Sequence, residues 1–71
     1  MATLHRRIVG QKILTYRKRA GISQEKLAEK AELSYKYVGE VERGTVNISL
    51  DSLARIAKAL KIKVRDLVND I

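Results

Sequence analysis

The sequence predicts an all-α fold, a compact domain of five helices that includes a helix-turn-helix. Three observations lead to this prediction. Apolar residues recur at spacings close to 3.6 through most of the chain, and no segment alternates with a period of two for long. Serine stands before three of the apolar stretches, where a helix N-cap is expected. The helices are expected at about residues 5–20, 24–31, 35–43, 50–60 and 64–70.

Serine and glycine residues mark where several of these helices begin and end. Ser23, Ser34 and Ser49 each offer a hydroxyl oxygen to the unpaired backbone amides of the first helical turn. Gly21 and Gly44 follow the first and third helices, and glycine readily takes the left-handed conformation that a helix C-terminus needs. A loop over residues 45–49 is expected between the third and fourth helices.

Residues 24–43 are expected to form the helix-turn-helix. Two short helices joined by a turn of three or four residues can cross at about 90–120°. Close crossing requires a small side chain on the first helix, and Ala28 supplies it. Val38 and Val41 supply β-branched apolar anchors beneath the second helix.

The length and charge of the chain favour one basic domain over residues 1–71. With 71 residues there is room for a single core. The net charge is +7, and residues 1–23 carry six Lys and Arg residues and no acidic residue. A basic end on a compact domain suits a polyanionic partner such as nucleic acid. Charge alone leaves two alternatives open, which are a membrane surface and a surface that only aids solubility.

The composition argues against an enzyme, a metal site and a membrane span. The chain has no Cys and only His5 as an imidazole, so disulfides and thiolate metal sites are excluded. It has no Gly-rich phosphate loop and no catalytic constellation. No apolar run approaches the roughly 20 residues that span a bilayer, and none follows the basic Met1–Arg7 segment as in a secretory signal. We expect a cytoplasmic protein without cofactor, metal or small-molecule ligand.

A set of spaced residues carries a family resemblance. The set comprises Ile22–Ala28, Leu33, Ser34, Val38, Val41–Gly44, Asn47–Leu50, Leu53, Ile56, Ala57, Ala59 and Leu60. Over about residues 8–68 the chain resembles the phage repressor and Cro family, also called the xenobiotic-response-element family. The resemblance implies a lambda-repressor-like fold and a transcriptional regulator that binds double-stranded DNA. Glu42–Gly44 and Asn47–Ser49 also resemble the controller proteins of restriction–modification systems.

Glu32 departs from the family pattern. Many members carry Gly at this position of the turn. If residue 32 has a positive φ, Glu costs on the order of 1 kcal/mol relative to Gly. The departure therefore bears on the geometry of the turn.

The second helix of the pair is expected to enter the major groove with its N-terminal residues closest to the base edges. The residues expected to read bases are Ser34, Tyr35, Lys36 and Glu40. Lys36 can donate to guanine O6 or N7, and Glu40 can accept from cytosine N4 or hold Lys36 in place. The alternative for Tyr35 and Lys36 is an ordinary exposed helix face.

Phosphate contacts are expected to outnumber base contacts. Gln24 begins the helix that crosses the DNA backbone, where a helix N-terminus favours a phosphate. The resemblance implies that further contacts come from Tyr37, Arg43, Thr45, Asn47 and Ser49. Helix capping is the alternative for Ser49, and turn formation is the alternative for Asn47.

The resemblance also implies a structural ion pair between Arg17 and Glu42, which would tie the first helix to the recognition helix. Removing one partner of a partly buried pair leaves the other charge uncompensated. Lys18 and Arg19 stay candidates for general attraction to DNA. Arg6 and Arg7 are expected either to form a flexible arm or to have no specific role.

A homodimer on two half-sites is expected, because one recognition helix reads too few base pairs to select a site in a genome. The residues expected at the dimer interface form an apolar stripe on the last helix, about residues 64–71: Val64, Leu67, Val68 and Ile71. The alternative is that this stripe packs within the chain against Ile56 and Leu60.

The main rival function is an antitoxin-type protein whose principal partner is a toxin. Binding of RNA or membranes through charge alone is a weaker rival, since the three Tyr residues are the chain's only aromatic side chains for base stacking. The operator sequence, and whether the regulator activates or represses, do not follow from the sequence.

Overall fold

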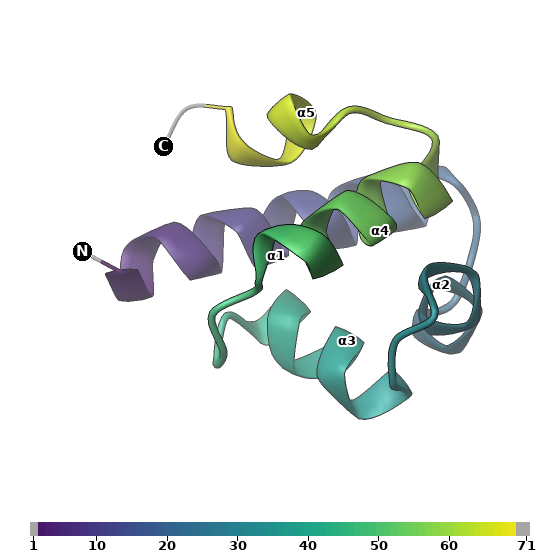
Figure 1. Cartoon of the computed structure of the whole chain (residues 1–71), viewed down its shortest axis with the longest axis horizontal. Helices are drawn as coiled ribbons and strands as arrows, with labels where there is room; N and C mark the ends of the chain where they lie inside the picture. Colours follow the sequence, from purple (N-terminus) through teal and green to yellow (C-terminus); the bar gives the residue numbers. More distant parts are fainter. Residues whose placement is uncertain (1, 70–71) are drawn as a thin grey trace.

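The computed structural model describes residues 2–69, with side chains from residue 5 onward, and this part of the chain forms five α-helices (Figure 1). Their bounds are α1 Ala2–Arg19, α2 Gln24–Ala31, α3 Tyr35–Arg43, α4 Leu50–Leu60 and α5 Val64–Val68. The three central helices have the predicted bounds, and the predicted all-helical fold is confirmed. The first helix begins three residues earlier than predicted. The last helix ends at Val68, and Asn69 after it is extended. The predicted end at residue 70 lies outside the described residues.

The three predicted serine N-caps are present. The Ser23 hydroxyl oxygen accepts a hydrogen bond from the Lys26 amide at 3.0 Å, and Ser34 accepts one from the Tyr37 amide at the same distance. Ser49 accepts from the Ser52 amide at 3.1 Å. Each such cap stabilises its helix by about 1 kcal/mol.

Two non-glycine residues take the left-handed conformation that ends a helix. Glu32 has a φ of 58°. Because this φ is positive, Glu at position 32 costs about 1 kcal/mol relative to Gly. Lys61 ends α4 in the same way with a φ of 60°, which was not predicted. Both helix ends are nevertheless closed by backbone hydrogen bonds, from Leu33 to Ala28 and from Ile62 to Ala57, at 2.9 Å each.

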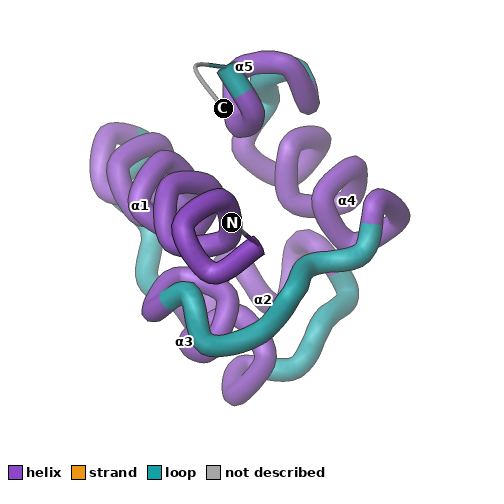
Figure 2. Tube along the Cα trace, turned by 90° about the vertical axis from the view of Figure 1, so that its left-hand side faces the viewer, coloured by secondary structure: helices purple, strands orange, loops and turns teal. Residues whose placement is uncertain are grey.

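One hydrophobic core joins all the helices. Figure 2 looks along α1 and shows α3 on one side of it and α4 and α5 on another. Each helix contributes one side chain with no exposed surface: Ile13, Leu27, Val38, Ile56 and Leu67. Full burial of one such side chain stabilises the fold by about 1.5–3 kcal/mol. The core holds α2 and α3 in their relative orientation and leaves the outer side of α3 to solvent.

The prediction for Leu67 is wrong. Its side chain is 0% exposed and lies in the core, so it cannot belong to a surface that a second copy covers. The intramolecular alternative applies to this residue, because the short α5 folds back onto α1 and α4. Val64 is half-buried against the same core, whereas Val68 is 36% exposed. Ile71 lies outside the described residues.

The helices α1 and α3 approach each other closely at Gly10. A Cβ atom on Gly10 would lie 2.8 Å from the Glu42 carbonyl oxygen and still closer to that of Val41. Both neighbours are backbone atoms of α3, so they cannot rotate away as a side chain can. Glycine is therefore required here by the crossing of two helices.

Within residues 2–69, no helix is long and apolar enough to cross a membrane.

Candidate nucleic-acid interface

The helix α3 presents one face to the core and the opposite face to solvent. Val38 and Val41 are buried beneath it, as predicted from their β-branched side chains. Tyr35 is 56% exposed, which is unusual for a large aromatic side chain. Lys36 is also exposed, and in the first turn it stands next to the free amides of the helix N-terminus. A basic group and an aromatic group thus project together from the start of α3.

The other two residues predicted to read bases have additional contacts within the chain. Ser34 caps α3 through its hydroxyl oxygen. Glu40 is half-buried, and its backbone carbonyl oxygen, not its carboxylate, accepts from the amide and the hydroxyl of Thr45, at 3.0 and 3.1 Å. Base reading by all four residues stays a prediction; Ser34, Tyr35 and Lys36 are exposed, and Glu40 is half-buried.

The buried carboxylate of Glu42 connects three helices. Arg17 on α1 donates to it twice, from Nε to Oε2 at 2.7 Å and from Nη2 to Oε1 at 3.2 Å. Gln24 on α2 donates from Nε2 to Oε1 at 2.8 Å. The Glu42 side chain is only 3% exposed, so these charge-assisted bonds lie in a shielded environment. The arrangement fixes α3 against both neighbouring helices.

The ion pair that the resemblance implies is therefore present, and Arg17 extends it. Its Nη1 donates to the Ile22 carbonyl oxygen at 2.9 Å, so the guanidinium also holds the loop between α1 and α2. The bond from Gln24 to Glu42 was not predicted. A separation of 18 residues carries no periodic signal, and only the folded arrangement brings these side chains together.

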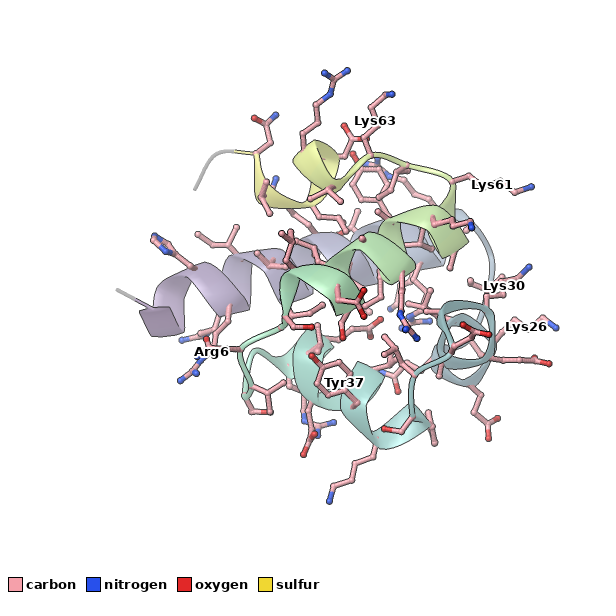
Figure 3. All side chains as sticks on the ribbon, viewed as in Figure 1. Arg6, Lys26, Lys30, Tyr37, Lys61 and Lys63 are labelled. Atoms are coloured by element: carbon pink, nitrogen blue, oxygen red, sulfur yellow. The ribbon has the colours of Figure 1, made fainter. Side chains whose placement is uncertain are left out.

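The remaining predicted phosphate contacts divide into two groups. Arg43 and Asn47 are exposed around the end of α3. Tyr37 is half-buried against the core (Figure 3), Thr45 donates its hydroxyl to the Glu40 carbonyl, and Ser49 caps α4 while donating to the Ser52 hydroxyl at 3.0 Å. In the structure Ser49 thus has the helix-capping role that was named as the alternative to phosphate contact. Contact with phosphate stays a prediction for the whole set.

The basic residues of α1 belong to a regular helix and not to a flexible arm. Arg6 and Arg7 lie within the helix, which corrects that expectation. Arg7 lies beside Gly44 at the end of α3, where a Cβ atom on the glycine would be 2.8 Å from the Arg7 Cα. The Arg19 guanidinium lies 5.4 Å from the centre of the Tyr16 ring, and Lys18 is exposed. These positions do not neutralise the positive charges, so Lys18 and Arg19 stay candidates for general attraction to DNA, whereas Arg17 is paired with a carboxylate.

The shared core, the short turn over residues 32–34 and the outward face of α3 define a helix-turn-helix protein. A family model described as helix-turn-helix matches residues 13–67. The chain therefore belongs to this family of DNA-binding transcriptional regulators, and it is not an enzyme.

Three similar proteins illustrate the range of the family. The chain is 42% identical over 65 residues to control protein C.BamHI of Bacillus amyloliquefaciens, covering 90% of this chain and 80% of that protein. The crystal structure of the restriction–modification controller protein C.AhdI from Aeromonas hydrophila superposes with a TM-score of 0.86 at 42% identity, covering 87% and 94%. The biofilm regulator SinR, crystallised in complex with DNA, gives a TM-score of 0.83 at 35% identity, covering 86% and 98%.

Proposed function

We propose that the protein binds an operator of two half-sites in double-stranded DNA as a homodimer, and that it controls its own promoter or a restriction–modification operon from within the cytoplasm. The observation that carries the proposal is the exposed start of α3, where Tyr35 and Lys36 project from a helix whose other face is fixed by the core and by Glu42. The similarity to two controller proteins supports the restriction–modification context.

The proposed docking follows from the sizes of the groove and the helix. The major groove of B-DNA admits an α-helix, and the N-terminal residues of that helix reach the base edges. Lys36 then donates to guanine O6 or N7, while Tyr35 contacts a thymine methyl or donates its hydroxyl. Arg43 and Asn47, at the other end of α3 and in the following loop, contact the backbone phosphates.

Lys36→Ala is expected to weaken binding to the operator by about 1–3 kcal/mol and to relax the preference at one base pair. Binding to random DNA should change much less. The matched control is Lys63→Ala, which removes the same charge on the opposite side of the molecule from α3 (Figure 3). Titration of both variants against operator variants checks this. Equal losses for the two variants would mean that Lys36 contributes charge and no base reading.

Self-association in this proposal uses Leu50 on α4 and Val68 on α5, two large apolar side chains that the described fold leaves exposed. Leu50 is 74% exposed, although it is a large apolar side chain at the start of α4. Val68, Ile48 and Leu53 line a shallow hollow next to the N-terminal half of α1. A second copy that covers the exposed surface of Leu50 and Val68 removes apolar area from water, at about 25 cal/mol per Å². This replaces Leu67 with Leu50 as the principal apolar contact.

Leu50→Glu is expected to convert a dimer into a folded monomer, because the added charge faces the partner and not the core. Sedimentation equilibrium gives the mass, and circular dichroism checks that the helices remain. Lys30→Glu, a charge change on the exposed side of α2, should leave the mass of a dimer unchanged. A wild-type monomer at the concentrations that occupy DNA, or a dimeric Leu50→Glu variant, would contradict the proposed interface.

A further inference from the structure

Gly39 lies in the middle of α3, where alanine would give a more stable helix. Unlike Gly10, it does not face a neighbouring backbone. It lies between Tyr35 and Arg43, four residues before and after it along α3, and it is itself buried beneath neighbouring side chains. Together with Gln24 and Lys36, these residues line a shallow hollow between α2 and α3.

The missing side chain of Gly39 leaves room for two polar groups. A Cβ atom at this position would lie 3.2 Å from Arg43 Nη1 and 3.9 Å from Gln24 Oε1. Arg43 therefore folds back along α3 over Gly39, toward the side chain of Gln24. A larger residue would push the guanidinium outward and fill the hollow. The displaced group is the free end of an exposed side chain, so the fold itself would tolerate the change.

The hollow has the chemistry of a phosphate site. Arg43 offers a planar guanidinium that suits two phosphate oxygens at once, and Lys36 adds positive charge on the same side. The nearest buried carboxylate, Glu42, is already compensated by Arg17 and Gln24. The donors at the hollow are therefore Arg43 and Lys36, because Gln24 turns its acceptor oxygen Oε1 toward residue 39 and donates its Nε2 to Glu42. The position of the Arg43 guanidinium depends on the space that Gly39 leaves beside it.

We infer that Gly39 is a positioning residue for DNA binding: it keeps the hollow open so that one backbone phosphate binds against the Arg43 guanidinium beside Gln24. This inference rests on the DNA binding proposed above. It also explains why the recognition helix contains glycine where packing does not require it.

The test is a size series at position 39, Gly39→Ala and Gly39→Leu, titrated against the operator and against random DNA at several salt concentrations. Gly39→Leu is expected to weaken binding to both DNAs by about tenfold, as for the loss of one charge-assisted hydrogen bond. Gly39→Ala should cause a smaller loss in the same direction. The slope of log K against log salt should fall by about one, while the melting temperature rises or stays unchanged.

A double-mutant cycle with Arg43→Ala separates positioning from other roles. If Gly39 acts through Arg43, Gly39→Leu causes little further loss once the guanidinium is absent. Three results would overturn the inference. Gly39→Leu could cause its full loss of affinity in the Arg43→Ala background as well. The size series could leave binding unchanged, or the loss of affinity could be confined to the operator. If the wild-type protein binds the operator and the Gly39 variants bind it equally well, this inference alone is refuted. Wild-type protein that binds neither DNA refutes the proposed function as well.

Discussion

Gly10→Ala is expected to lower the free energy of unfolding by about 3 kcal/mol or more, at the upper end of the range for overpacked sites. The new methyl group would stand 2.8 Å from the Glu42 carbonyl oxygen and closer still to that of Val41, so α1 and α3 would have to separate. The gain in helix propensity, about 1 kcal/mol, does not offset this. In a domain of this size the melting temperature should fall by roughly 10–20 °C.

Gly21→Ala is the matched control for this variant. Gly21 has a φ of +73°, and a Cβ atom there meets nothing within 4 Å. The control therefore suffers only the conformational cost, about 1–2 kcal/mol. Thermal and denaturant unfolding of the two variants compare the effects. A Gly10→Ala variant as stable as wild type would show that the two helices are not packed as closely as the structure has them.

Arg17→Ala is expected to cost about 3–5 kcal/mol, because it leaves the Glu42 carboxylate buried without its ion-pair partner. It also removes the hydrogen bond to the Ile22 carbonyl oxygen, which holds the loop before α2. Since small domains are marginally stable, such a loss can unfold much of the population at 37 °C. Denaturant titration followed by circular dichroism measures it.

Lys18→Ala serves as the control, since it removes a neighbouring positive charge from an exposed position. Its stability should stay within about 0.5 kcal/mol of wild type. The double variant Arg17→Ala with Glu42→Ala should lose less than the sum of the two single losses, because no isolated buried charge remains. Strict additivity would argue that the ion pair contributes little as a unit.

The local features of the fold were predictable from single residues. Serine at positions 23, 34 and 49 marks three helix starts, because its hydroxyl oxygen satisfies amides that the helix cannot. The left-handed conformation of Glu32 was predicted only as one possibility, because a residue with a φ of 58° is usually glycine. Lys61 gave no such sign. Propensity identifies favoured conformations, and the closure of the helix end overrides it at these two residues.

The relations between distant elements were harder to predict. The periodicity correctly identified an apolar stripe on α5. It does not tell whether the residues that cover this stripe belong to the same chain or to a partner. Leu67 fills the core, while Leu50, in the first turn of α4, is 74% exposed. The bond from Gln24 to Glu42 and the space above Gly39 depend on how α2 and α3 cross. Such contacts require the assembled structure.

Titration of the purified protein against the DNA upstream of its own gene, beside random DNA of equal length at about 150 mM salt, tests the central claim most directly. We expect a preference of roughly 10³-fold or more for the upstream DNA, and a footprint with two related half-sites about one helical turn apart. Equal affinity for both DNAs, lost together as salt rises, would contradict it. The basic charge would then act only as a general attraction to polyanions.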